Sequence, residues 1–192
     1  MKYNFKYLLF VLLGCQVYTL YSQQAIVRYK GEIQKTYQDS FVVAFEQRKD
    51  VPMHVKQRLS NTYYSALPEF FELRISKNES YYFEDESLDN IEGYNIGSLS
   101  PISDYYTNSL KVLMIEYTSS FGKVKRVALD WDLSSGDTKQ IGDYTCFKAT
   151  ATERLFSRQG FYYNRDVVAW FTPEIPLHFG PAHYSGLPGL VI

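Results

Sequence analysis

Hydrophobic and polar residues alternate along much of this chain, and a period of two is typical of β-strands with one buried face. The first such run covers residues 26–34. Two further runs, 70–76 and 79–85, are separated only by Lys77-Asn78, which predicts a hairpin. Four more strands are predicted at 109–119, 123–133, 144–153 and 166–172, and residues 154–165 are predicted to form an extended hairpin loop between the last two.

One stretch has a helical rather than an alternating pattern. Between Pro52 and Pro68 the apolar residues recur at nearly helical intervals: Met53, Val55, Leu59, Tyr63 and Leu67. Because proline disfavours a helix interior and restricts the residue before it, the two prolines bound the predicted helix.

Many strands and one helix predict a fold of the α+β class, mostly β. The expected architecture is a curved antiparallel sheet, an open half-barrel, with the helix packed on its concave side. The sequence has no repeat, no low-complexity tract and no Gly/Ser linker, so residues 23–192 are predicted to form a single domain.

The first 22 residues have the layout of a secretory signal peptide. Lys2 and Lys6 precede a short apolar run at 7–13, and Ser22 is a small residue at the predicted cleavage site, so the mature chain would begin at Gln23. An alternative remains open, because Leu12-Leu13-Gly14-Cys15 is similar to a lipoprotein box. In that case Cys15 is lipidated and provides the membrane contact. Both alternatives predict export, to the periplasm or to the periplasmic face of the outer membrane.

Charge and aromatic content narrow the class of function. The formal net charge is -1, which gives no basic surface for nucleic acid. Aromatic residues make up 17% of the chain, with 18 Tyr, 13 Phe and 2 Trp. Such residues are common in strands, so they indicate either simply a β-rich fold or a platform for a carbohydrate or apolar ligand. The acidic stretch 84–104 is predicted to be a surface loop, since its carboxylates lack calcium-loop spacing.

Three sequence motifs, in order, resemble those of the GLPGLI family of exported Bacteroidota proteins. The first is LRISKNESYY, with Glu79-Ser80; the second is LDWDLSSGDTKQIGDYTCFKAT; the third is AWFTPEIPLHFGPAHYSGLPGLVI. The residues that carry the resemblance are Trp131, Thr138, Lys139, Ile141, Gly142, Tyr144, Cys146, Ala149, Thr150, Trp170, Pro173, Pro176, Gly180, Gly186, Leu187, Pro188, Gly189 and Leu190. The chain departs from the pattern in having Val191-Ile192 after Leu190 and no further C-terminal region.

The resemblance implies no biochemical activity, because the GLPGLI family is known mainly as one of unknown function. Some members look like partners of outer-membrane transport systems. The strand order is also similar to that of periplasmic lipoprotein carriers with an unclosed half-barrel, although a shared fold does not determine function.

The residues at 187–190, Leu-Pro-Gly-Leu, predict a type II turn, with proline at its second position and glycine at its third. Leu190, Val191 and Ile192 then predict the start of a strand, and because it stops within an apolar run we expect the chain to be truncated there. The motif is either a conformational lock packed by Leu187 and Leu190 or an exposed recognition loop.

Candidate chemistry is sparse. After signal cleavage Cys146 is the only cysteine, and we expect it to be a buried structural thiol rather than a nucleophile. His178 and His183, with Glu174, are weak candidates for a zinc site, because no helix sets their spacing. No catalytic residue and no cofactor is predicted.

Three functions are consistent with these features. The favoured one is a non-enzymatic envelope protein that binds an apolar ligand or an envelope protein partner. A periplasmic hydrolase is an alternative, although no nucleophile–base pair has a recognisable spacing. The third is an accessory of an outer-membrane TonB-dependent transport system, which differs from the first only in its partner.

Overall fold

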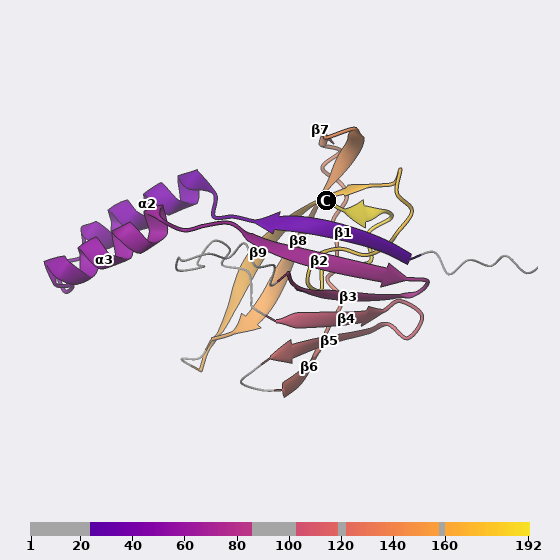
Figure 1. Ribbon diagram of the computed structural model, residues 1–192, viewed down its shortest axis with the longest axis horizontal. Coiled ribbons are helices and arrows are strands. Elements are labelled where there is room, and N and C mark those ends of the chain that lie inside the picture. Colours follow the sequence, from indigo (N-terminus) through magenta and orange to yellow (C-terminus); the bar gives the residue numbers. More distant parts are fainter. Residues whose placement is uncertain (1–23, 86–102, 119–121, 158–159) are drawn as a thin grey trace, which may run out of the picture.

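The computed structural model describes residues 24–85, 103–118, 122–157 and 160–192, and within them the chain forms two antiparallel sheets. The first sheet, sheet A, contains β1 (Gln24–Gly31), β2 (Glu69–Ser76), β3 (Glu79–Glu84), β4 (Asp104–Asn108), β5 (Leu113–Thr118) and β6 (Gly122–Arg126), side by side in chain order. The second, sheet B, has the order β10-β9-β8-β7 and contains β7 (Thr138–Ile141), β8 (Tyr144–Phe156), β9 (Tyr162–Thr172) and β10 (Leu190–Val191). Sheet B lies behind sheet A in Figure 1.

The predicted α+β class, mostly β, is confirmed, and so is the hairpin at Lys77-Asn78. Two short strands, β4 and β7, were not predicted. The first lies at the end of a polar stretch, and the second exposes nearly all of its residues, so neither has a clear apolar alternation. The predicted strand 123–133 is a strand only as far as Arg126. The loop prediction for 154–165 is wrong at both ends, since β8 runs to Phe156 and β9 begins at Tyr162.

The structure has two helices, α2 (Lys35–Glu46) and α3 (Met53–Tyr64), where one was predicted at 52–68. The sequence pattern missed α2 because Gln34 makes no side-chain cap at its start and because its centre contains two β-branched valines, Val42 and Val43. Neither described helix is long and apolar enough to cross a membrane.

The prediction that a helix packs on the concave side of the sheet is wrong. Figure 1 shows α2 and α3 as a hairpin that projects from the connection between β1 and β2. The two helices pack on each other, with the rings of Phe41 and Tyr63 stacked 4.6 Å apart and the Gln38 amide donating to the Tyr63 carbonyl. Within the described residues, neither helix contributes a residue to the two hydrophobic clusters that form the core of the sheets.

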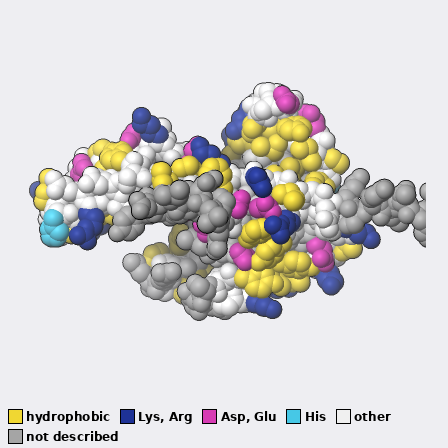
Figure 2. Space-filling view, in the orientation of Figure 1, with side chains coloured by type: hydrophobic (Ala, Val, Ile, Leu, Met, Phe, Trp, Pro, Cys, Tyr) yellow, Lys and Arg dark blue, Asp and Glu magenta, His cyan; other side chains and the backbone are white. Residues whose placement is uncertain are grey.

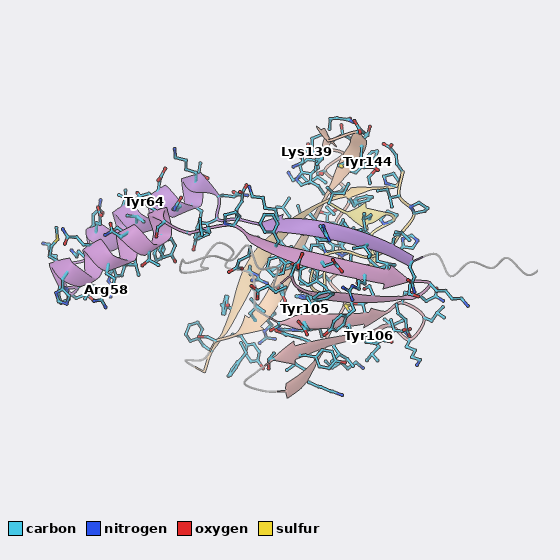
Figure 3. The ribbon with its side chains drawn as sticks, in the orientation of Figure 1. Arg58, Tyr64, Tyr105, Tyr106, Lys139 and Tyr144 are labelled. Carbon is cyan, nitrogen blue, oxygen red and sulfur yellow. The ribbon has the colours of Figure 1, made fainter. Side chains whose placement is uncertain are left out.

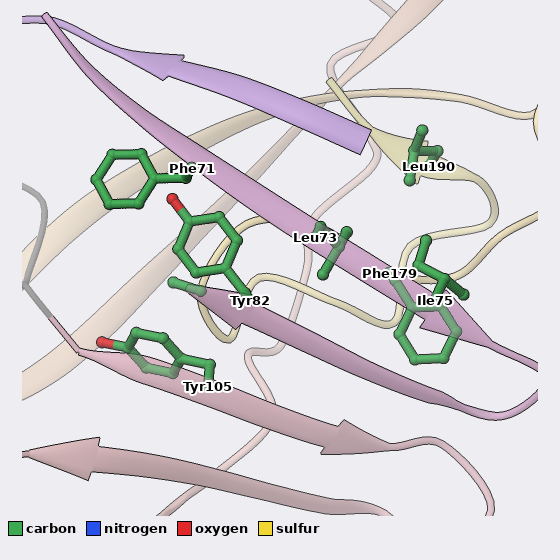
Figure 4. Close-up of a cluster of buried hydrophobic side chains, with 8 residues drawn as sticks. Phe71, Leu73, Ile75, Tyr82, Tyr105, Phe179 and Leu190 are labelled. Carbon is green, nitrogen blue, oxygen red and sulfur yellow. The ribbon is translucent and has the colours of Figure 1, made fainter. Parts of the chain in front are cut away.

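Residues 173–192, the C-terminal segment, contribute buried side chains to the core on both sheets. Phe179 and Leu190 pack on Leu73 and Ile75 of β2, as Figure 4 shows, in a cluster that also contains Phe71, Tyr82, Tyr105 and Ala182. A second cluster joins Leu187 and Val191 to Ala149, Ala169 and Phe171 of sheet B. The Tyr29 hydroxyl of β1 donates to the Val191 carbonyl at 2.7 Å. Tertiary packing between the sheets therefore depends on this segment.

The predicted strand start at Leu190 is confirmed by its pairing with Thr172, but the predicted type II turn before it is wrong. The Gly189 N–H donates to the Leu187 carbonyl at 2.8 Å, which closes a three-residue turn around Pro188. The Leu190 N–H donates to Ile175, not to Leu187. Gly189 is needed because the backbone approaches closely here: a Cβ atom at this position would lie 2.1 Å from the Thr172 carbonyl oxygen.

Replacing Gly189 by Ala should therefore force the turn away from β9. We expect the free energy of unfolding to fall by about 1–3 kcal/mol, the usual cost of overpacking, and by more for Gly189→Val. Chemical denaturation would measure the change. The matched control is Gly136→Asn, at a φ of 65° with no atom within 4 Å of an added Cβ, where asparagine should be tolerated. Equal stability of Gly189→Ala and wild type would contradict the close approach.

Candidate functional site

The motif residues of the C-terminal segment are mostly parts of the core. Leu187, Gly189 and Leu190 are buried, whereas Gly186, which precedes them, and Pro188, which lies among them, are exposed. Gly180 is also buried, and a Cβ there would lie 2.2 Å from the Tyr184 carbonyl oxygen. This packing supports the conformational lock rather than the exposed recognition loop. Pro173 and Pro176 lie on the exposed stretch that leaves β9.

The three zinc candidates do not come together. His178 is exposed, and its Nδ1 lies 2.8 Å from the Leu187 carbonyl oxygen. Glu174 accepts a hydrogen bond from the Thr145 N–H at 2.9 Å. His183 is buried, and its Nε2 lies 2.9 Å from Glu153 Oε1. In the part of the chain that the structure describes, no group of three or more His, Cys, Asp and Glu side chains is arranged to hold a metal ion.

The motif residues on and beside sheet B make contacts within the sheet and, in one case, with the C-terminal segment. The Trp131 indole N–H donates to the Ser185 carbonyl at 3.0 Å. Lys139 lies over the Trp170 ring, 4.2 Å from its centre, at the β7–β8 end of the sheet where Figure 3 labels Lys139 and Tyr144. Gly142 forms the turn between these strands with a φ of 55°. These three features hold the local structure of sheet B and of the loop beside it.

Cys146 is fully buried in β8, as expected for a structural thiol, with Sγ 3.7 Å from the Tyr144 carbonyl oxygen. Burial is the main reason that its pKa is raised above the ordinary value for a thiol. A buried thiol with a raised pKa is a poor nucleophile, because the thiolate is the reactive form.

In a Cys15→Ser background, where Cys146 is the only cysteine, we expect a maleimide reagent to label the native protein very slowly and the unfolded protein rapidly. Cys146→Ser should cost about 1–3 kcal/mol, because it buries a hydroxyl in place of a thiol. Cys146→Ala is the matched control and should cost less. Rapid labelling of the native thiol would contradict its burial.

A polar cluster built around a buried carboxylate joins the C-terminal segment to sheet B. Glu153 of β8 lies at its centre, with Arg165 Nη2 2.6 Å away and His183 Nε2 2.9 Å away. Arg165 also donates to the Tyr184 hydroxyl at 2.9 Å. The Tyr105 ring, from sheet A, covers His183, with ring centres 5.7 Å apart. Burial tends to raise the pKa of Glu153, but hydrogen bonds from His183 and Arg165 outweigh it and lower the pKa to about 2.

Three polar atoms of this cluster are buried without a hydrogen-bond partner among the described residues: Tyr105 Oη, Arg165 Nε and His183 Nδ1. Burial, followed by the nearby Glu116 carboxylate, raises the pKa of Tyr105. Glu116 lies on β5 of sheet A, as Tyr105 lies on β4, and it pairs with Arg126 of β6 at 2.5 Å. Because aromatic rings pack over His183 and its carboxylate partner is buried, we interpret the cluster as a structural clamp rather than a catalytic site.

Glu153→Gln should lower the free energy of unfolding by about 2–3 kcal/mol at neutral pH, because it removes the charge that Arg165 and His183 surround. The pKa of Glu153 falls from 4.5 to about 2 on folding, so its stabilisation is complete above pH 4.5 and is lost as the pH falls toward 2. The difference between wild type and variant should shrink over that range.

Chemical denaturation at a series of pH values would measure this difference. The control is Glu32→Gln, an exposed carboxylate paired with Lys30, whose loss should cost little. A difference for Glu153→Gln that stays constant down to pH 3 would contradict the pairing.

The outer face of sheet A carries aromatic side chains that are register partners on neighbouring strands. One cross-strand row consists of residues paired across five strands: Ile26, Arg74, Tyr81, Tyr106 and Ile115. The neighbouring row is polar and contains Gln24, Ser76, Glu79 and Asn108. Figure 2 shows hydrophobic side chains gathered on this face with charged ones between them.

A cleft of about 390 Å³ lies where these two rows meet, lined by Gln24, Ile26, Arg74, Glu79, Tyr81 and Tyr106, among others. Its volume is within the range of small-molecule sites. Figure 3 labels Tyr106 on β4. We define the cleft and the residues named here as the aromatic cleft.

Hydrogen bonds hold the side chains of the aromatic cleft in place. The Tyr106 hydroxyl and the Asn108 amide both donate to Glu79 Oε1 at 2.8 Å. The Tyr81 hydroxyl donates to Asp104 at 2.5 Å, and this bond is the main reason that the pKa of Tyr81 is raised to about 12. Arg74 donates to the buried carboxylate of Glu72 at 2.5 Å. The lining is thus pre-organised, which reduces the entropy lost on binding.

A second hollow, of about 620 Å³, lies on sheet B and is lined by acidic and small residues that include Asp130, Asp132 and Asp166. Thr152 donates to Asp166 at 3.3 Å, and Asp132 accepts from the Ser134 N–H. It has no aromatic lining residue, so we do not treat it as the main site.

The sequence pattern did not identify the aromatic cleft. Tyr81 and Tyr106 are 25 positions apart and become neighbours only through the β3–β4 register. The signals that were present are the high Tyr content and the predicted β2–β3 hairpin, which pairs Arg74 with Tyr81.

Comparison with protein-family models found one match, to the family described as "Protein of unknown function (Porph_ging)", over residues 158–192. The match covers β9 and the C-terminal segment, so it concerns the part that fills the core, and it includes no residue of the aromatic cleft. Comparisons with curated proteins and with solved structures returned no match.

Proposed function

We propose that this chain is an exported protein of the cell envelope, of the GLPGLI type, and that it acts by binding rather than by catalysis. The N-terminal 22 residues support export, and the motifs from Trp131 to Leu190 support the family. The match at 158–192 to a family of unknown function includes the GLPGL motif itself and is consistent with this assignment. The proposed location is the periplasm, or the periplasmic face of the outer membrane if Cys15 is lipidated.

The observation that carries the proposal is the aromatic cleft. Its aromatic and charged side chains are exposed enough to contact a ligand, with Tyr81 38% exposed, yet hydrogen bonds to Asp104 and Glu79 hold both tyrosines. Solvent-exposed aromatic side chains in fixed positions provide contact area at a low entropic cost. The cleft therefore supports binding of a small ligand on the outer face of sheet A.

The alternative of a periplasmic hydrolase has weaker support. Hydrolysis needs a nucleophile or an activated water within reach of the substrate. His183 is the described histidine with a carboxylate partner, and it is buried beneath Tyr105 and Tyr184. Cys146 is buried as well.

An accessory role in an outer-membrane TonB-dependent transport system has one structural observation in its favour. The α2–α3 hairpin projects away from the sheets, and it exposes Tyr37, Val43, Met53 and Tyr64. Helices of 12 residues are marginal on their own, so contact with another protein would stabilise the hairpin. The transporter would then be the partner protein.

Native mass spectrometry of the protein purified from its own envelope would test the proposal. We expect a polypeptide that starts at Gln23 and carries a small molecule, and we expect Tyr81→Ala to lose that molecule while Tyr144→Ala keeps it. The two tyrosines have nearly equal exposure, 38% and 39%, and lie on different sheets.

A chain that retains residues 1–22 and is found outside the envelope would overturn export. A protein that carries no small molecule but a second polypeptide would favour the accessory role and overturn binding at the aromatic cleft.

A further inference from the structure

We propose that the aromatic cleft binds a neutral saccharide, an inference that rests on the proposed binding function. It identifies the chemical class of the ligand from two properties of the lining: the arrangement of its aromatic and polar rows, and its balance of charge. Tyr81 and Tyr106 contact the ring faces of the sugar, and Gln24, Arg74 and Glu79 bind its hydroxyl groups.

The aromatic row suits the apolar face of a sugar ring. Tyr81 and Tyr106 are register partners on β3 and β4, so their Cβ atoms are about 5 Å apart on the same face of the sheet. Tyr81 also lies beside Phe83, with ring centres 5.4 Å apart, which extends the aromatic surface along β3. A pyranose has C–H groups on its faces and hydroxyls on its edge, so it can stack on such a surface while its edge stays available for hydrogen bonds.

The polar row lies one step along the strands, where the edge of a stacked sugar would reach. Gln24 on β1 and Glu79 on β3 belong to the polar row, whereas Arg74 on β2 belongs to the aromatic row. A sugar hydroxyl both donates and accepts, and these side chains offer an amide, a carboxylate and a guanidinium. Arg74 is already oriented by Glu72 and lies over the Phe83 ring, 4.8 Å from its centre.

The charges of the lining argue against other small ligands. One arginine, Arg74, and one carboxylate, Glu79, line the cleft, and Asp104 adjoins it through Tyr81. The carboxylates would repel a phosphate or an acidic ligand, since like charges at close range are unfavourable. A purely apolar ligand would remove water from Gln24, Arg74 and Glu79 and offer no new hydrogen bond in its place, which is costly. A neutral, hydroxylated ligand with an apolar face satisfies both the rings and the polar groups.

Isothermal titration calorimetry with a panel of short neutral oligosaccharides tests the inference: β-1,4-glucan, β-1,3-glucan, α-mannan and β-1,4-linked N-acetylhexosamine. We expect binding of at least one, weakened about tenfold or more by Tyr81→Ala, which corresponds to losing one aromatic contact. Tyr106→Phe keeps the ring and removes the bond to Glu79, so it should weaken binding less. Tyr144→Ala, the matched control on sheet B, should leave binding unchanged, and melting temperatures would verify that each variant is folded.

Each outcome decides one point. Binding that falls in Tyr81→Ala but not in Tyr144→Ala supports the inference. Binding that Tyr81→Ala leaves unchanged overturns the assignment to the aromatic cleft. Failure of the whole panel to bind overturns the saccharide, and the envelope-purified protein then separates the two proposals. If the envelope-purified protein carries a lipid or peptide that Tyr81→Ala loses, the binding function stands and only the saccharide is wrong. If the protein carries no such ligand, both proposals are wrong.

Discussion

The two sheets of this protein are held together by a segment that is neither strand nor helix for most of its length. Residues 173–192 pack Phe179 and Leu190 against sheet A and Leu187 and Val191 against sheet B. Burial of these side chains stabilises the packing of the two sheets through the hydrophobic effect. The Glu153 carboxylate pairs with Arg165 and His183 and so fixes the position of the segment. A buried carboxylate is tolerable only with such partners, so the clamp and the apolar packing depend on each other.

This arrangement explains why the backbone of the segment is so restricted. Gly180 and Gly189 lie where another part of the chain approaches too closely for a side chain. Pro188 lies at the centre of the turn that directly precedes β10. A segment buried between sheets must also satisfy its own N–H and C=O groups, and many of its hydrogen bonds return to itself, as between Leu190 and Ile175 or Val191 and Phe179. The motif is therefore most readily understood as an internal structural unit.

Local patterns in the sequence were sufficient for the β2–β3 hairpin, helix α3, the buried thiol of Cys146 and the strand at Leu190, because each depends on neighbours along the chain. They failed where distant parts meet. The position of α2 and α3 could not be inferred, since an amphipathic helix does not specify which surface it contacts. His183 was a metal candidate by residue type, whereas its partner Glu153 lies 30 positions away on β8. The aromatic cleft depends on the register of four strands.

The hydrogen bond between Tyr29 and Val191 spans 162 positions, and it joins the first described strand to the last. Sheet A can form its hairpins early, but within the described residues the partners that its inner face buries in the core cluster come from residues 175–190. Folding is therefore dominated by contacts of long sequence separation, which slows it and leaves partly made chains with exposed apolar strands. For a protein that is exported as proposed, this delay has a use: the chain stays unfolded, and so able to pass through a translocation channel, until residues 173–192 can pack on sheet A.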